Sequence, residues 1–436
     1  MAIHDLLWAC PDCGVTGSIR RSSGRKERCV ACGTTFHRGR GASIVASREG
    51  RPDRVLAAAE WLSKLPAIEE RFPDRDGSMP GPEPVVLRVA REVTPVRLNR
   101  ELLGWAERFG PPRAATMTLT ATSLRLEGKG AASASEIPLE QLMAIQASSS
   151  TLQVGSRDRP VLSLRFHDSS VLLWEHLLRG RARRRFRELG LGEITEWQPV
   201  IRTATPDPGR VAGIATEVRG RVPKPGTCPS PGRLYRTCQW IVRTAWQATG
   251  RLEVEGIENI PMKGPFLLIC NHQSDLDPLL IHSVIPRPVH VVAKSTLFNA
   301  PGLRWILPRI AAIPVRRYQT DAQAVRVALR RLGAGCAVGI FIEGERSWDG
   351  RLQDPKPGTV RLALKAGVPI ILCAISGAYD ASPRWAPRIQ PGTVSIRFLP
   401  AIHFSAIHRR HEREAALGPA TRRIMEAIAC AFPGRL

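Results

Sequence analysis

The arrangement of four cysteines constrains the fold of the first forty residues more tightly than any other feature of the sequence. Cys10 and Cys13 form one CxxC pair, and Cys29 and Cys32 form a second pair after fifteen intervening residues. Each pair places two thiolates on one turn of the chain, and two such turns can close a tetrahedral zinc site. A segment this short cannot build a sufficient apolar core, so zinc binding, worth on the order of 10 kcal/mol, would supply the free energy of its folding. We therefore predict a zinc site in residues 1–40.

This cysteine spacing resembles that of a zinc ribbon. The four cysteines leave no evident open coordination position, so the predicted site is structural and not catalytic. The alternative is that four unrelated thiols lie buried in the core, and the doubled CxxC pattern argues against it. Zinc ribbons serve many purposes, so the resemblance does not by itself indicate a function.

The sequence is strongly basic. Its 436 residues include 63 Lys and Arg against 39 Asp and Glu, which gives a net charge of +24. This excess favours polyanionic partners such as nucleic acid, anionic lipid headgroups or phosphorylated substrates. The charge alone does not choose among them.

Three further features bear on location. A secretory signal has a basic segment followed by an apolar stretch. The start of the sequence does not show this pattern. No apolar run approaches the roughly 18 residues that span a bilayer. The ten cysteines fit a reducing compartment if four of them hold a metal and six are ordinary buried thiols. We expect a cytoplasmic protein that lies peripherally on the inner face of the cell membrane.

The pattern of the chain predicts five segments. We expect the zinc ribbon in residues 1–40, a linker with a short helix in 41–112, a β-rich module in 113–190, a second linker in 191–231 and an α/β domain in 232–436. The linkers are predicted from their Pro, Gly and Arg content. The α/β domain should have a central sheet flanked by helices.

Residues 113–190 contain several short strand-like segments separated by turn residues, including a hairpin through 156–159. An amphipathic helix over 169–189, which carries Trp174, follows them. Strands closed by one such helix resemble a pleckstrin-homology-like module, which implies a small β-barrel capped by the helix. The arginines in 179–187 either bind phosphates of lipid or nucleic acid, or form a solvated helical face.

Residues 234–250 have helical spacing and combine Trp240, Ile241 and Trp246 with Arg243. Tryptophan and arginine together suit the bilayer interface, where the ring is half buried and the cation meets anionic headgroups. Packing against the protein's own core would give the same pattern. We expect the helix to lie at the membrane interface, and the core alternative remains open.

Residues 266–285 predict a buried strand, a short polar turn and a helix. The turn contains His272 and Asp277 in an HxxxxD arrangement, at the C-terminal end of a strand, where α/β enzymes assemble their sites. A histidine there can take a proton from an attacking hydroxyl if a carboxylate fixes its tautomer and stabilises the imidazolium. Asp277 could instead be an N-cap that precedes Pro278.

Four more segments follow in order, at 291–305, 311–317, 339–347 and 355–377. Together with the HxxxxD segment, they resemble the lysophosphatidate acyltransferase branch of the glycerophospholipid acyltransferase family, over roughly residues 233–404. The resemblance implies that a fatty acyl group moves from acyl-CoA or acyl carrier protein to the free hydroxyl of 1-acylglycerol 3-phosphate.

The resemblance also implies roles for individual residues. His272 would be the general base, and Asp277 would be its orienting partner. The residues implied near the anionic acceptor are Lys294, Arg317, Glu343, Gly344, Arg346, Ser347 and Lys356.

The chemistry of two of these residues can be examined separately. Arg346 follows a predicted strand, and a bidentate guanidinium suits a phosphate monoester. Glu343 would repel that phosphate, so we expect it to position Arg346 or a loop amide. An ordinary ion pair in the loop is the alternative role for this carboxylate.

Two other functions remain open. The zinc ribbon, the net charge and the arginine run would also suit a nucleic-acid-binding or scaffold protein, which would not account for the HxxxxD segment. The same acyl transfer could use another acceptor, such as glycerol 3-phosphate or a different lysophospholipid. We expect an acyl donor, a lysophospholipid acceptor and an anionic membrane surface as partners. Nucleic acid is not favoured, and no obligate protein partner is evident.

Overall fold

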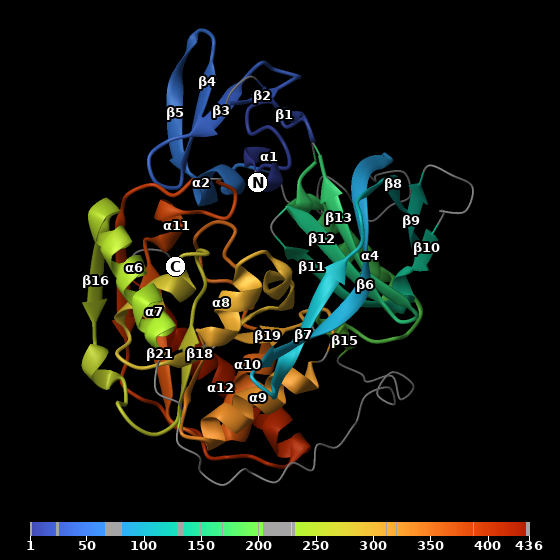
Figure 1. Cartoon of the computed structure of the whole chain (residues 1–436). Coiled ribbons are helices and arrows are strands. Elements are labelled where there is room, and N and C mark those ends of the chain that lie inside the picture. Colours follow the sequence, from blue (N-terminus) through green and yellow to red (C-terminus); the bar gives the residue numbers. More distant parts are fainter. Residues whose placement is uncertain are drawn as a thin grey trace.

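A computed structural model describes residues 2–432 of the protein, with gaps at 23–25, 66–80, 129–134, 149, 168, 199, 204–227, 229–231, 311, 320 and 387. Figure 1 shows three parts: an N-terminal antiparallel sheet in blue, a β-rich module in cyan and green, and a C-terminal α/β part in yellow to red. The C-terminal part is the largest, and both other parts lie against it.

The C-terminal part is built around a seven-stranded sheet, which confirms the predicted α/β fold. The strand order is β16-β22-β21-β17-β20-β18-β19; the β21–β22 pair is antiparallel and the other five pairs are parallel. The strands are β16 (Arg251–Glu255), β17 (Phe266–Cys270), β18 (Val289–Lys294), β19 (Ile313–Val315), β20 (Ala337–Phe341), β21 (Ile370–Ser376) and β22 (Thr393–Phe398).

Helices cover both faces of this sheet because its central strand, β17, is apolar throughout. All five residues of β17 are buried, and successive side chains point to opposite faces. Leu268 packs in one core with α6 (Arg233–Thr249), α7 (Asp277–Val284) and α11 (Ala378–Ala381). Leu267 packs in the core on the other face, with the remaining long helices. These are α9 (Ala322–Gly333), α10 (Pro357–Ala366) and α12 (Arg410–Cys430).

The N-terminal part is a five-stranded antiparallel sheet in sequence order. It extends the predicted ribbon well past residue 40. The elements are α1 (Ile3–Leu6), β1 (Ile19–Arg21), β2 (Glu27–Cys29), β3 (Thr35–Arg38), β4 (Ser43–Arg48), β5 (Arg51–Ala57) and α2 (Ala58–Ser63).

Residues 41–112 differ from the linker that the sequence predicted. The expected short helix is present as α2, but β4 and β5 continue the N-terminal sheet. Two further strands, β6 (Glu83–Leu98) and β7 (Glu101–Phe109), belong to the next part. For β5 and β6 the prediction failed because these two strands carry charged residues at many exposed positions, so their apolar residues do not stand out from a polar background.

The β-rich module contains a seven-strand path in the order β10-β9-β8-β6-β13-β12-β11. It starts at Glu83, whereas the sequence placed its start at 113. The predicted hairpin is present, with Ser156 opposite Arg159. The further elements are β8 (Arg113–Leu119), β9 (Ser123–Gly128), β10 (Ser135–Pro138), η1 (Leu139–Gln141), β11 (Leu142–Ser148), β12 (Thr151–Ser156), β13 (Arg159–Phe166) and α4 (Val171–Glu188).

Helix α4 covers the apolar face of this module. Its N-cap is Ser170, whose hydroxyl accepts a hydrogen bond from the Leu173 amide, and Trp174 is fully buried among the strands. A β-rich module closed by one helix agrees with the expected architecture. The membership of this module in the pleckstrin-homology-like family stays a prediction.

The hairpin formed by β6 and β7 leaves the β-rich module and packs into the C-terminal part, beside β19 and α9 (Figure 1). Its residues Val96, Leu103 and Ala106 are buried in the same hydrophobic core as α9. Gly104 lies against Pro314 of β19. A Cβ atom at Gly104 would lie 2.7 Å from Cγ of Pro314 and 3.0 Å from its carbonyl oxygen. The hairpin is therefore part of the C-terminal core.

Most of the second predicted linker, 191–231, lies outside the described residues. Within it the structure describes the short strands β14 (Ile194–Glu196) and β15 (Arg202–Thr203), and also Cys228. Cys228 forms a disulfide with Cys336, and His290 lies beside the two sulfur atoms. The prediction that six cysteines are ordinary buried thiols is therefore wrong for Cys228 and Cys336. The two residues are 108 positions apart, and no local sequence pattern indicates that they lie close together.

The buried hairpin gives a testable stability prediction. Leu103→Ala should lower the free energy of unfolding by about 2–4 kcal/mol, because it leaves a cavity in the C-terminal core. The change can be measured by urea denaturation. Val93→Ala, on the same hairpin but with the side chain 44% exposed, is the control and should change stability by less than about 0.5 kcal/mol. Equal effects of the two substitutions would contradict the packing of the hairpin.

Candidate active site

The turn after β17 brings His272 and Asp277 together, as the sequence analysis required. Nδ1 of His272 lies 2.8 Å from Oδ2 of Asp277. A carboxylate can only accept a hydrogen bond, so Nδ1 carries the proton, and Nε2 is the ring nitrogen left to act as a base. The imidazole also stacks on Phe341, with ring centroids 4.1 Å apart. Two contacts thus fix the orientation of the ring.

Asp277 does not form the helix cap that was the alternative role for it. The residue is fully buried and is itself the first residue of α7. Its Oδ2 accepts hydrogen bonds from the backbone amides of Gln273 and Ser274, at 2.6 and 2.8 Å. These amides belong to the turn that follows His272, so one carboxylate oxygen closes the turn and also binds the imidazole.

Glu343 contacts the same turn from the neighbouring strand end. Its carboxylate accepts hydrogen bonds from the amide of His272, at 2.8 Å, and from the amide of Gln353, at 3.2 Å. Burial raises the pKa of Glu343 well above its ordinary value. Of the roles considered for Glu343, these contacts correspond to the positioning of loop amides.

The loop after β20 carries Arg346 to the edge of the HxxxxD turn. Nη1 of Arg346 lies 2.7 Å from Oδ2 of Asp275, whose side chain is 78% exposed. The Arg346 side chain is only 16% exposed, but the Asp275 carboxylate lies largely in solvent, so a phosphate could take its place. Gly344 has φ +67°, and a Cβ atom there would lie 2.8 Å from Cγ of Lys356, which explains the glycine at this position.

Ser347 is less accessible than a substrate ligand would be. Its amide donates to the carbonyl oxygen of His272 at 2.8 Å, and its hydroxyl donates to the carbonyl oxygen of Arg351 at 2.7 Å. The side chain is also buried. These contacts make Ser347 part of the scaffold that joins the loop to His272.

Lys294 and Arg317 lie in the same cationic cluster as Arg346. Lys294 ends β18, and Arg317 follows β19. Burial, and secondarily the positive charge of Arg317, lower the pKa of Lys294 to about 7, and Arg346 contributes in the same direction. Burial also lowers the pKa of Arg317. Glu107 acts in the opposite sense on Lys294, and Glu345 and Asp275 do so on Arg317. An anionic ligand would relieve the repulsion that remains among the cations.

The sequence analysis missed a second arginine that supports the loop. Arg384 is buried, donates a hydrogen bond to the carbonyl oxygen of Arg346 at 2.8 Å, and lies over the ring of Trp348 at 3.6 Å. Trp348 in turn belongs to the large hydrophobic core of the N-terminal sheet and the β-rich module. Arg384 carries no sequence signal, because its role arises only when these parts meet.

The β-rich module also contacts the cationic cluster. Nζ of Lys294 donates to Oγ of Ser148 at 2.7 Å and to Oε1 of Gln153 at 3.4 Å. The hydroxyl of Tyr318, the residue after Arg317, donates to the same Gln153 oxygen. Neither Ser148 nor Gln153 was predicted as a site residue.

The arginine run on α4 is largely engaged within its own module. Arg179 pairs with Glu175 at 2.7 Å, and Arg184 pairs with Glu188 at 2.7 Å. The guanidinium groups of Arg179 and Arg183 lie 5.5 and 5.2 Å from the ring of Trp197. Arg183 and Arg187 are nevertheless exposed, as the alternative of a solvated helical face expects, and phosphate binding stays a prediction.

The four cysteines of the CxxC pairs converge on one point and could hold a metal ion. Their sulfur atoms all lie within 4.8 Å of one another, with Cys10 and Cys32 at 3.6 Å and Cys13 and Cys29 at 3.7 Å. Four sulfurs at about 2.3 Å from a tetrahedral ion would be about 3.8 Å apart. The observed spacing therefore fits such an ion.

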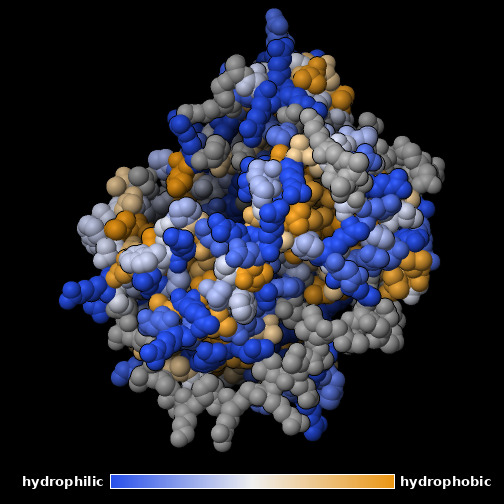
Figure 2. Space-filling view, turned by 45° about the vertical axis from the view of Figure 1, so that its right-hand side comes forward, coloured by the Kyte–Doolittle hydropathy of each residue, from blue (hydrophilic) through white to orange (hydrophobic). Residues whose placement is uncertain are grey.

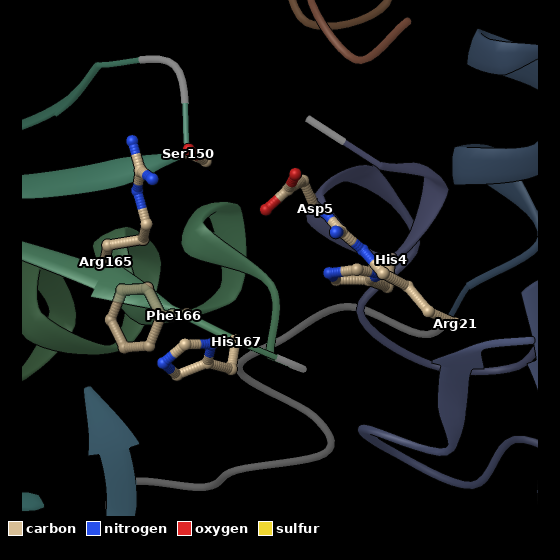
Figure 3. Close-up of a pocket in the computed structure, with 7 residues that line it drawn as sticks. All are labelled: His4, Asp5, Arg21, Ser150, Arg165, Phe166 and His167. Carbon is tan, nitrogen blue, oxygen red and sulfur yellow. The ribbon is translucent and has the colours of Figure 1, made fainter. Parts of the chain in front are cut away.

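A separate hollow lies between the N-terminal sheet and the β-rich module (Figure 3). It is lined by His4, Asp5, Arg21, Ser150, Arg165, Phe166 and His167. None of these residues belongs to the site around His272.

The class of the C-terminal part follows from comparison with protein families. Residues 251–376 match the family model described as Acyltransferase. This range contains His272 and Asp277, together with the three cations around them. Because of this match, we call the C-terminal part the acyltransferase domain.

Several curated relatives are similar in this region, and each is named 1-acyl-sn-glycerol-3-phosphate acyltransferase. The Homo sapiens alpha protein is 32% identical over 156 residues, 35% of this chain and 55% of its own length. The Pseudomonas aeruginosa protein is 32% identical over 168 residues, 38% of this chain and 63% of its own. A chloroplastic protein of Arabidopsis thaliana is 29% identical over 159 residues, 36% and 44% of the two chains.

The chain thus spans only about half the length of the curated relatives it matches. Among solved structures, the 1-acyl-sn-glycerophosphate acyltransferase PlsC from Thermotoga maritima overlaps with a TM-score of 0.38 and 26% identity. The overlap covers 44% of this chain and 79% of that one.

Proposed function

We propose that the protein transfers a fatty acyl group from acyl-CoA or acyl carrier protein to the free hydroxyl of 1-acylglycerol 3-phosphate. The observation that carries this proposal is the position of the His272–Asp277 pair beside the cationic cluster of Lys294, Arg317 and Arg346. The names of the relatives support the choice of acceptor. The fold alone would not make that choice.

In the proposed reaction, Nε2 of His272 takes the proton from the acceptor hydroxyl while Asp277 stabilises the imidazolium that forms. The oxygen attacks the thioester carbonyl, the new C–O ester bond forms and the C–S bond breaks. The imidazolium then returns its proton to the thiolate that leaves. No acyl-enzyme is required, so a single base serves both proton transfers.

The cationic cluster would bind the phosphate of the acceptor. A phosphate monoester carries up to two negative charges and can accept paired hydrogen bonds from a guanidinium. Arg346 carries such a fork at the edge of the HxxxxD turn, where it contacts Asp275, and Lys294 adds a second positive charge. Arg346 also precedes Ser347, whose amide contacts His272, so the phosphate and the reacting hydroxyl would be held by one loop.

The catalytic pair gives the first test of this function. His272→Ala should lower kcat about 100- to 10,000-fold with little change in the KM of the acceptor, since it removes the general base. Asp277→Asn should lower kcat in the same direction, because it removes the carboxylate that holds the Nδ1 proton. The assay is transfer from labelled acyl-CoA to 1-acylglycerol 3-phosphate, with identification of the lipid product.

His411→Ala is the matched control for the catalytic histidine. The side chain of His411 is 79% exposed on α12, so its removal should leave turnover unchanged. Wild-type rates in His272→Ala would disprove the mechanism. An absence of product with 1-acylglycerol 3-phosphate, but product with glycerol 3-phosphate or another lysophospholipid, would reassign the acceptor.

We further propose that the protein acts at an anionic membrane surface, where its amphiphilic acceptor resides. No helix among the described residues is long and apolar enough to cross a bilayer. Hydrophilic residues cover most of the face seen in Figure 2, and hydrophobic residues form smaller patches there. One of these patches would supply the contact with the membrane.

Helix α6 supplies a candidate for that contact. Trp246 of this helix is buried, as expected if the segment packs against the protein's own core. Trp240 and Ile241, however, are 67% and 51% exposed. Arg236 and Arg243 are exposed one turn before and after Trp240. An exposed tryptophan between two arginines suits the headgroup region of an anionic bilayer.

This proposal predicts a measurable loss of membrane binding. Trp240→Gln and Ile241→Gln should each weaken co-sedimentation with anionic liposomes roughly tenfold, because each removes apolar surface from the bilayer interface. Ile389→Gln, at a side chain that is 59% exposed elsewhere, is the matched control and should bind as the wild type does. Equal binding of all four proteins at physiological salt would exclude α6 as the contact.

For the four-cysteine cluster we propose zinc as the bound ion, with Cys10, Cys13, Cys29 and Cys32 as its ligands. Four thiolates at tetrahedral spacing suit Zn²⁺ and leave no position for a substrate. Bound zinc would hold the turns of the N-terminal sheet in place. The sheet contacts the C-terminal domain, since Arg38 donates hydrogen bonds to the carbonyl oxygens of Asp380 and Ala381.

Zinc binding can be checked by metal analysis and thermal unfolding. The purified protein should contain one zinc per chain, and Cys13→Ser should lose it. The Tm should fall by roughly 5 °C or more, because a loss of even ~2 kcal/mol shifts the Tm of a domain of about 150–250 residues by about 4–8 °C. Cys430→Ser, at an exposed free cysteine, should keep both the zinc content and the Tm. Retention of zinc by Cys13→Ser would refute the assignment.

A further inference from the structure

One face of the β-rich module is polar at the point where it meets the acyltransferase domain. Successive residues of β12 point to opposite sides, so Leu152 and Val154 pack in the module's own core while Gln153 faces the other way. Gln153 is 3% exposed, and its carbonyl oxygen accepts hydrogen bonds from Lys294 and Tyr318 of the acyltransferase domain. A buried amide at this place joins the two parts.

These bonds reach two of the three chain segments that supply the cationic cluster. Lys294 lies at the end of β18, and Tyr318 directly follows Arg317. Ser148, on the neighbouring strand β11, accepts the shorter of the two hydrogen bonds from Lys294, at 2.7 Å. The module therefore holds Lys294 and the residue next to Arg317 through a single pair of strands.

The β6–β7 hairpin fixes the next turn of the same segment. Oγ of Ser295 lies 3.4 Å from Oε2 of Glu107, and the side-chain amide of Asn299 donates to the carbonyl oxygen of Glu107 at 2.6 Å. Ser295 and Asn299 are the two ends of η3 (Ser295–Asn299), which follows Lys294 directly. Contacts from two places in the module thus hold residues 294–299.

The chemistry of the Lys294 contacts distinguishes them from an ordinary interface ion pair. Ser148 and Gln153 offer uncharged oxygens, which orient the ammonium without cancelling its positive charge. A carboxylate in the position of Gln153 would satisfy the same donors and would also neutralise Lys294. These two neutral acceptors leave the charge of Lys294 uncompensated, and Glu107 is the carboxylate that acts on it. An anion bound at Lys294 would also be attracted by Arg317 and Arg346.

We propose that Gln153 and Ser148 are positioning residues of the acceptor site, which hold Lys294 and the Arg317 segment in place for the phosphate monoester of the acceptor. This inference rests on the proposed acyl transfer. It assigns a role to the β-rich module, which becomes a wall of the phosphate site and not a separate adaptor. The module acts on the substrate through Lys294, and the reacting groups remain in the acyltransferase domain.

Kinetics of Gln153→Leu test this role. The substitution keeps the approximate volume of the side chain and removes its hydrogen bonds. It should raise the KM for 1-acylglycerol 3-phosphate about 10- to 100-fold, the effect of losing a hydrogen bond to a charged group, and leave the KM for acyl-CoA unchanged. Gln141→Leu, at an exposed glutamine of the same module, is the matched control and should retain both KM values.

Gln153→Glu separates positioning at a phosphate site from simple support of an interface. As interface support, the new carboxylate would pair with Lys294, and the KM for the acceptor would stay near the wild-type value. At a phosphate site, the carboxylate competes with the substrate, and the KM should rise at least as much as in Gln153→Leu. A wild-type acceptor KM in Gln153→Glu, or a parallel rise of the KM for acyl-CoA, would overturn the inference.

Two further measurements keep the test decisive. If Gln153→Leu does not fold, Ser148→Ala removes only one hydroxyl and should raise the acceptor KM severalfold. Calorimetric titration with glycerol 3-phosphate reports phosphate binding without turnover. If the wild-type protein binds glycerol 3-phosphate but forms no lipid product, only the proposed acyl transfer is refuted. If the wild type and Gln153→Glu bind glycerol 3-phosphate equally well, only the positioning role of the β-rich module is refuted.

Discussion

The hydrogen bond between His272 and Asp277 depends on a turn that the surrounding protein holds from several sides. Asp277 accepts two amides of the turn as well as the imidazole proton, and Glu343 accepts the amide of His272. Both carboxylates are buried, so water cannot compete for these bonds, and their geometry persists without substrate. A catalytic base that is fixed before substrate arrives needs little reorganisation in the reaction.

The loop beside this turn is supported by parts that lie outside the acyltransferase domain. Trp348, Tyr379 and Trp385 are buried in the same core as residues of the N-terminal sheet and the β-rich module. The hydroxyl of Tyr379 donates to the carbonyl oxygen of Trp348 at 2.6 Å and accepts from the indole of Trp385 at 2.8 Å. The N-terminal half therefore stabilises the segment that follows Arg346 and forms one folded unit with the active site.

The sequence was most informative where a local pattern determines the structure. The apolar strand before His272, the turn that holds Asp277 and the spacing of Cys10, Cys13, Cys29 and Cys32 are short-range features, and the structure shows each of them. The contacts of Gln153 and the burial of Leu103 depend on pairings between residues more than a hundred positions apart, and Arg384 contacts a loop residue 38 positions away. The hydrophobic periodicity and the composition of the sequence do not indicate such pairings. These features, and the strands in residues 83–109, were therefore missed.

The shared core has a consequence for synthesis of the chain. The ribosome releases the N-terminal sheet and the β-rich module well before Trp348, Tyr379 and Trp385, which complete their apolar surface. Until then, that surface and the apolar side of the β6–β7 hairpin stay open to water, to chaperones and to other nascent chains. The early modules therefore reach their final burial only after residues 348–385 have been synthesised, and the acyltransferase domain acts as the late partner that shields them.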